Sequence, residues 1–177
     1  MELKTDATLK GPVWAETIDK LVAKTGKVFK TNWDLYALSI TIGMMHDCQI
    51  ESDDMVPDGY EAEPRYVPRN VLGDLQRRTL LEFMLQSAMI TTKHLDLSEN
   101  ERLEIAFNDD KKLEFNPIAF LTKFANYGVT MIKEAIDDTD DVETLEALMT
   151  LLNTTYESGI AGLDDEVDID DIDIDDE

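Results

Sequence analysis

The sequence predicts an all-α fold, a compact bundle of about five or six helices followed by a disordered acidic C-terminal tail. Apolar residues recur three and four positions apart in several stretches, which is the spacing of one helix face. Residues that cap helices precede some of these stretches. The last fourteen residues, 164–177, hold ten carboxylates and no base, so they cannot repay their own ordering entropy. We therefore expect a flexible lead-in over 1–10, a helical domain over 11–160 and a disordered tail over 161–177.

Two helices are expected before residue 46. Pro12 suits the first turn of the first helix, and Gly26 suits its end. Thr31 and Asp34 have the form of a capping box at the start of an apolar run that reaches Met45. Part of this run alternates like a strand, but its length and its cap favour a helix. Because the run is apolar on several faces, it also allows a subunit interface and hence a homo-oligomer.

Residues 49–70 form a long loop in this prediction. They contain three prolines and no helical periodicity. A loop of this length inside a compact domain is usually functional or disordered.

Helical periodicity returns after the loop and continues to the tail. A strongly amphipathic helix is expected from residue 74 or 75 to His94. Ser98 and Glu101 form a second capping box, which opens a short helix. Further helices are expected to begin at Pro117, after Asn116, and at a cap on Asp141, the last of them ending near residues 158–159.

Composition excludes several classes of protein. Asp and Glu number 39 against 16 Lys and Arg, and the net charge of −23 opposes non-specific binding to nucleic acid or anionic lipid. No window approaches 18 consecutive apolar residues, so no membrane span is expected. Cys48 is the single cysteine, and the N-terminal residues lack the apolar core of a secretion signal. We expect a cytoplasmic protein.

No catalytic, metal or cofactor site is expected. His46 and His94 both fall near the ends of predicted helices, where the helix dipole stabilises an imidazolium. His46 and Cys48 are too close in sequence to face each other on a helix, so they make a poor nucleophile pair. The sequence holds no zinc motif and no glycine-rich phosphate loop, and the tail lacks the glycine of a calcium loop. An enzyme that uses His46 or His94 is the third of our hypotheses.

Arginines are concentrated in one segment. Four of the five lie within fourteen residues, namely Arg65, Arg69, Arg77 and Arg78. Guanidinium groups bind carboxylates and phosphates through two parallel hydrogen bonds, so this segment is a candidate partner-binding site. Solvated charge, or pairing with Glu61, Glu63 or the tail, is the alternative.

Two further sets of residues are candidates for binding. The first set consists of lysines that would contact nucleic acid or an acidic partner: Lys20, Lys24, Lys27 and Lys30. The second consists of β-branched residues that interrupt the acidic tail and would contact a protein partner: Val167, Ile169, Ile172 and Ile174. A tail that only improves solubility is the alternative for the second set.

Residues 17–43 carry a family resemblance. They read as a helix that ends in Thr-Gly, a short link with a phenylalanine, and a long apolar helix that ends near Gly43. This stretch resembles the small helical DndE-like proteins of bacterial phage-defence and DNA-modification operons. The resemblance implies a non-catalytic subunit of a defence assembly. This chain departs from that family in its length and its acidity, so direct binding to nucleic acid is not expected.

The sequence therefore predicts a non-catalytic accessory or scaffolding subunit of a bacterial multi-protein assembly that acts by binding another protein. The alternative is an acidic DNA mimic, in which carboxylates spaced like phosphates occupy a nucleic-acid-binding protein. The charge of −23 motivates this second function.

Overall fold

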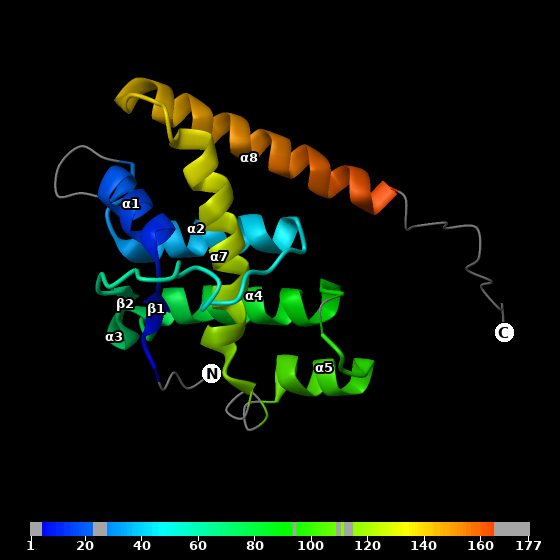
Figure 1. Ribbon diagram of the computed structural model, residues 1–177. Coiled ribbons are helices and arrows are strands. Elements are labelled where there is room, and N and C mark those ends of the chain that lie inside the picture. The colour runs from blue at the N-terminus through cyan, green and yellow to red at the C-terminus, as the bar shows by residue number, and fades with distance from the viewer. Residues whose placement is uncertain (1–4, 23–27, 94, 109–110, 112–114, 165–177) are drawn as a thin grey trace, which may run out of the picture.

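A computed structural model describes residues 5–22, 28–93, 95–108, 111 and 115–164 of the chain. The described part is mostly helical, as predicted, and it adds a two-stranded sheet that was not predicted (Figure 1). Its elements in chain order are β1 (Ala7–Leu9), α1 (Pro12–Leu21), α2 (Asn32–Met45), β2 (Arg65–Val67), α3 (Arg69–Leu72), α4 (Leu75–Thr91), α5 (Glu99–Phe107), α7 (Pro117–Ile136) and α8 (Asp141–Asp164).

The crossing of α2 and α7 forms the centre of the domain (Figure 1). The two backbones touch at this crossing because each helix places a glycine there. A Cβ atom on Gly43 would lie 2.1 Å from the carbonyl oxygen of Phe124, and one on Gly128 would lie 1.9 Å from that of Ser39. Large side chains of both helices, such as Tyr36 and Leu121, fill the core on either side of the contact.

The apolar character of α2 has an explanation within one chain. α7, α8, α4, α1 and β2 all contact this helix, and its buried residues point in several directions. The all-round apolar pattern therefore gives no reason to expect a subunit interface on α2.

The sheet changes the prediction for the first ten residues. β1 pairs antiparallel with β2, with Ala7 opposite Val67 and Leu9 opposite Arg65. Ala7, Leu9 and Val67 are fully buried. Residues 7–9 are thus part of the core and not part of a flexible lead-in, and β2 occupies a piece of the segment expected to be a long loop. Three-residue strands are too short to show a periodicity in the sequence.

Part of the remaining loop is held against α7. The Asn126 side chain accepts a hydrogen bond from the Trp14 indole at 2.9 Å and donates one to the Ile50 carbonyl at 3.0 Å. The Ile50 amide donates to the Lys123 carbonyl at 3.0 Å, and the Met55 side chain is buried. The part of the segment from Ile50 to Met55 is therefore held to the domain, whereas most of residues 57–63 are exposed.

Most predicted helix limits are confirmed. The capping boxes at Thr31 and Ser98 are both present, and Asn116 caps α7. Four limits were wrong. α1 ends at Leu21 and not at Gly26, and α4 ends at Thr91 and not at His94, because Val22 and Thr92 are already extended. Asp140, and not Asp141, caps α8, since its carboxylate accepts hydrogen bonds from the amides of residues 142 and 143, and α8 continues to Asp164. The residues from 165 onward, which include most of the predicted tail, lie outside the described part.

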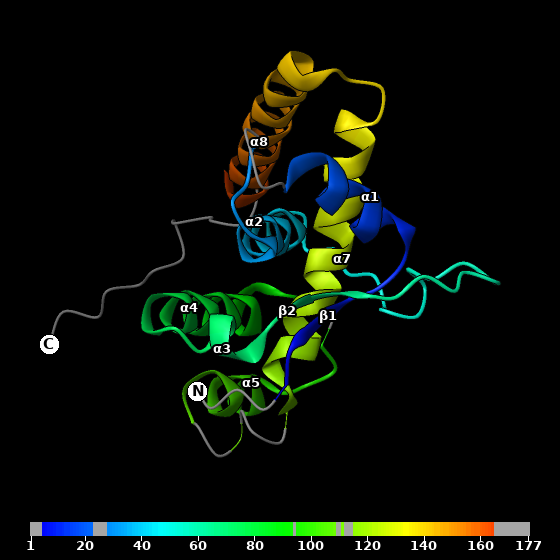
Figure 2. The same cartoon turned by 90° about the vertical axis from the view of Figure 1, so that its left-hand side faces the viewer.

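The other helices are grouped toward the two ends of α7 (Figures 1 and 2). α8 lies across its C-terminal end beside α2, while α4 and α5 lie toward its N-terminal end. None of the helices in the described part of the chain combines the length and the apolar content that crossing a bilayer requires.

Candidate protein-binding surface

The four clustered arginines have different surroundings. Arg65 in β2 donates from one guanidinium nitrogen to both carboxylate oxygens of Asp19 in α1, at 2.9 and 3.2 Å. Arg69 begins α3, and its backbone amide donates to the Asp6 carboxylate at 2.7 Å. Arg65 thus joins the small sheet to α1 through a carboxylate that was not among the expected partners, Glu61, Glu63 and the tail; both side chains remain substantially exposed, so the pair contributes little stability.

Arg77 and Arg78 lie in the first turn of α4. Within the described part of the chain, neither guanidinium forms an ion pair with a carboxylate. Arg77 borders an open depression of about 430 Å³, whose other lining residues are Trp33, Asp74, Gln76 and Leu80. Arg69 is likewise without an ion pair in this part of the chain and is exposed, whereas Arg77 and Arg78 are half-buried, so three of the four predicted arginines have guanidinium groups that are not paired with a carboxylate there.

Exposed apolar side chains continue from these arginines along α4 and α5. They are Leu80, Phe83 and Ile90 on α4, with Leu103 and Phe107 on α5. Phe83 has the helical spacing of a core residue, but its side chain is 65% exposed. We call these five residues, together with Arg77 and Arg78 of the first turn of α4, the α4–α5 face; Arg77 lies one turn before Leu80, whereas Arg78 lies toward the side of the buried Leu81.

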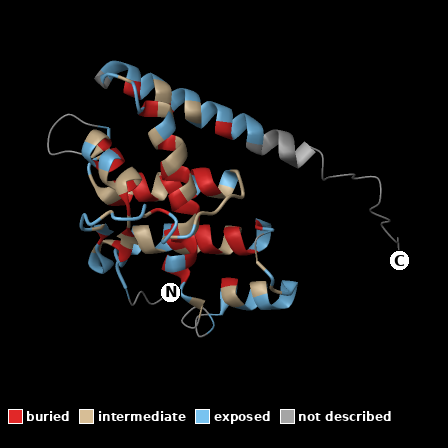
Figure 3. Ribbon diagram, in the orientation of Figure 1, coloured by how far each residue is buried: buried red, intermediate tan, exposed pale blue. Residues whose placement is uncertain are grey.

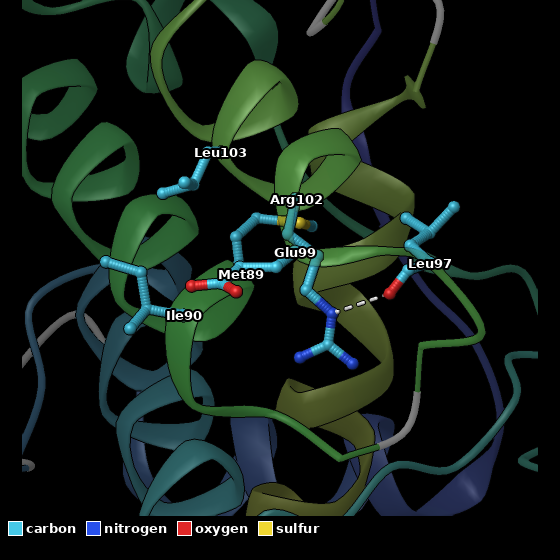
Figure 4. A pocket seen from close by; sticks show the side chains of 6 residues that line it. All are labelled: Met89, Ile90, Leu97, Glu99, Arg102 and Leu103. Carbon is cyan, nitrogen blue, oxygen red and sulfur yellow. Dashed lines mark hydrogen bonds between the residues drawn. The ribbon is translucent and has the colours of Figure 1, made fainter.

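A cavity of about 430 Å³ lies between α4 and α5 in this face (Figure 4). Ile90 and Met89 border it from α4, and Glu99 and Leu103 border it from α5. The Arg102 side chain fixes the link between the helices by donating to the carbonyls of residues 92, 95 and 97 at 2.7, 2.8 and 3.3 Å. Arg102 therefore supports the shape of the face, and its donors are used within the chain.

Two of the four candidate lysines, Lys20 and Lys30, lie in the described part of the chain. The Lys20 ammonium donates to the carbonyls of Ile136, Asp137 and Thr139 at the C-terminal end of α7, where a positive charge is favoured by the helix dipole. Lys30 is exposed. Lys24 and Lys27 lie outside the described residues, as do Val167, Ile169, Ile172 and Ile174 of the tail.

Of the two histidines in the enzyme hypothesis, His46 lies in the described part of the chain. His46 is the C-cap of α2, and its Nε2 lies 3.4 Å from the Thr155 hydroxyl of α8. The centroids of the His46 and Tyr127 rings are 5.8 Å apart, and the rings are tilted by 56°. Burial, and then the neighbouring Cys48 thiol, raise the pKa of the Tyr127 phenol. His94 lies outside the described residues. Over the ranges that the structure describes, no three His, Cys, Asp or Glu side chains gather in a way that could hold a metal ion.

No family model, curated protein or solved structure matches this chain. The surface chemistry of the described residues is therefore the basis for a function. The α4–α5 face combines apolar side chains with two available arginines, and the signal for it in the sequence was the spacing of Leu80, Phe83 and Ile90 directly after Arg77 and Arg78.

Proposed function

We propose that this chain is a non-catalytic accessory or scaffolding subunit that binds another protein through the α4–α5 face. The observation that supports the proposal most directly is the set of five exposed large apolar side chains on α4 and α5, together with two arginines in the first turn of α4 that form no ion pair in the described part of the chain. Exposed apolar patches of appreciable size on monomeric proteins commonly mark interaction sites.

The chemistry of the face indicates the kind of partner. Aromatic side chains and arginines contribute most of the binding energy in many interfaces, and Phe83, Phe107 and Arg77 have this character. Arg77 and Arg78 form a local positive site on a chain whose net charge is −23. An apolar protein surface with carboxylates at its edge would match both features.

The proposal is tested with the full-length chain as bait in extracts of the native host, using chemical cross-linking and mass spectrometry. Two variants probe the face: Phe83→Ser, which removes an exposed ring, and Arg77→Glu with Arg78→Glu, which reverses the charge. Tyr66→Ser, which removes an exposed ring from β2 outside this face, is the matched control. We expect both variants to lose a protein that wild type and the control capture at equal bait concentration.

The same partner must then be purified and its affinity measured directly. Loss of one buried aromatic contact is expected to weaken binding by about tenfold or more. Wild-type affinity in both variants, with their far-ultraviolet circular dichroism unchanged, would remove the α4–α5 face from the proposal and with it the main support for a scaffolding role.

A further inference from the structure

α8 carries two rows of side chains that differ in burial (Figure 3). The inner row packs on α7 and α2 and consists of Thr144, Leu148, Leu151 and Thr155. The outer row is exposed to solvent and consists of Val142, Leu145, Met149, Leu152 and Tyr156. The inner row contains two threonines, whereas the outer row has only large side chains. α8 therefore presents much of its apolar surface away from its own domain.

The outer row has the spacing of a coiled-coil seam. Its members follow one another at intervals of three, four, three and four residues, which is the a and d pattern of a heptad repeat. Their exposed fractions run from 39% at Leu152 to 72% at Val142. α8 thus has two heptads of an apolar seam that remains exposed in the described part of the chain.

α8 is held firmly at its start, so the row has a defined direction. The Asp140 carboxylate accepts hydrogen bonds from two amides of the first turn at 2.9 Å, and the Asp140 amide donates back to Glu143. The Thr139 and Thr144 hydroxyls are 2.7 Å apart, and Lys20 binds the carbonyls of the turn before α8. A surface that is ordered before binding loses less entropy when a partner arrives.

Carboxylates follow one flank of the outer row. Glu143, Glu146 and Glu157 each come one residue after a member of the row, and all three are exposed. The helix contains no lysine or arginine. A ligand that lies along the row would therefore contact the apolar seam and, on this flank, the glutamates of a helix that has no basic residue.

We propose that the outer row of α8 binds a basic amphipathic helix of a partner protein. Such a helix would place its own apolar residues, at heptad spacing, against Leu145, Met149 and Leu152, and its lysines or arginines beside Glu146 and Glu157. This interface goes beyond the proposed function, since it lies at the other end of α7 from the α4–α5 face and needs a partner of opposite charge.

A second copy of the chain fits the same surface less well. Two α8 helices paired through their outer rows would bring acidic flanks together without a base on either helix. The two chains would each carry a net charge of −23. Like charges at an interface are unfavourable, so charge complementarity selects the basic helix over the homodimer.

The experiment uses the full-length protein and a labelled synthetic peptide of about three heptads, with Leu at a and d and Lys at e and g. Fluorescence anisotropy at about 0.15 M salt measures its affinity. A peptide with Glu in place of every Lys tests the charge, and a scrambled peptide of the same composition tests the apolar spacing. We expect the basic amphipathic peptide to bind at least tenfold more tightly than either, a difference of about 1.4 kcal/mol.

Two double variants locate the site. Leu145→Ser with Met149→Ser removes the centre of the seam, and its side chains are exposed, so the fold is retained. Glu146→Lys with Glu157→Lys reverses the flank without touching the Asp140 cap. We expect the seam variant to lower the affinity for the basic peptide by tenfold or more. The flank variant should lower the affinity for the basic peptide and raise the affinity for the acidic peptide. Phe83→Ser with Ile90→Ser, on the α4–α5 face, should leave both affinities unchanged.

Three results would overturn the inference. The scrambled peptide could bind as tightly as the amphipathic one, which would reveal non-specific attraction to an acidic chain. The seam variant could retain wild-type affinity. Sedimentation could show a wild-type dimer that the seam variant converts to a monomer, which would assign the row to a second copy. None of these results bears on the α4–α5 face, because its partner is measured separately with Phe83→Ser.

Discussion

Replacement of Gly128 by alanine tests the central packing contact of the fold. The new Cβ atom would approach the carbonyl oxygen of Ser39 to 1.9 Å. An ordinary contact begins at 3.4 Å, so α2 and α7 would have to separate by 1.5 Å, the difference between these two distances. The clash involves a backbone atom, and no change of rotamer relieves it.

The expected loss of stability follows from two opposing effects. Alanine favours a helix interior by about 1 kcal/mol over glycine. Overpacking in a core costs about 1–3 kcal/mol when flexible side chains absorb it, and occasionally more. Because two buried helices must move apart here, we expect a net decrease of about 3 kcal/mol in the free energy of unfolding, a large part of the about 5–15 kcal/mol of a typical domain.

Urea denaturation followed by circular dichroism measures this change. Gly73→Ala is the control for a mild approach, since its Cβ atom would lie 3.2 Å from the Arg69 carbonyl oxygen, which needs to give by only a few tenths of an ångström. Gly43→Ala opens the same crossing from the other helix, so the double variant should lose less stability than the sum of the single variants. A decrease below about 0.5 kcal/mol for Gly128→Ala, or strict additivity with Gly43→Ala, would refute a rigid backbone contact.

Three further predictions concern other parts of the chain. Asn126→Ala leaves the buried Trp14 indole N–H and the half-buried Ile50 carbonyl without their partner. At about 1–3 kcal/mol for each group, urea denaturation should show a loss of about 2–6 kcal/mol, and a loss below about 1 kcal/mol would contradict this reasoning. Hydrogen bonds from the Ser98 hydroxyl and amide lower the pKa of Glu101. The stabilisation by this cap on α5 is therefore present above the ordinary glutamate range and is lost as the pH falls through the lowered pKa. Carboxyl NMR titration should show a higher Glu101 pKa in Ser98→Ala, and an unchanged value would exclude the hydroxyl as a cause. Deletion of residues 165–177 should weaken binding of a partner captured by the whole chain if Val167, Ile169, Ile172 and Ile174 contact it, whereas undiminished binding would leave the tail a role in solubility.

The DNA-mimic hypothesis differs from the proposed scaffolding role in its response to salt. Carboxylates that replace phosphates bind mainly through long-range charge, so the affinity should fall steeply with ionic strength. An interface centred on Phe83 and Phe107 depends more on apolar burial and should respond weakly. Affinity of the captured partner over a range of salt concentrations therefore distinguishes the two functions.

Local signals in the sequence predicted the helices well. The capping boxes at Thr31 and Ser98 depend on residues three positions apart, and the structure contains both. The candidate site was predicted only in part. Arg77 and Arg78 are available on α4, but Arg65 is engaged with Asp19, which lies 46 positions away in the sequence. Pairings over such distances leave no periodic pattern.

The sequence by itself determined the helical segments, their caps and the excess of negative charge, because each depends on neighbouring residues or on composition. The tertiary structure alone decided which side of each helix faces solvent. Phe83 and Leu145 satisfy the pattern of a core residue, yet both are exposed, since the partners of α4 and α8 approach from other directions. Likewise, nothing in the sequence next to Lys20 indicates a partner. Its ammonium nevertheless binds carbonyls at the end of α7, because the chain returns to it more than a hundred residues later.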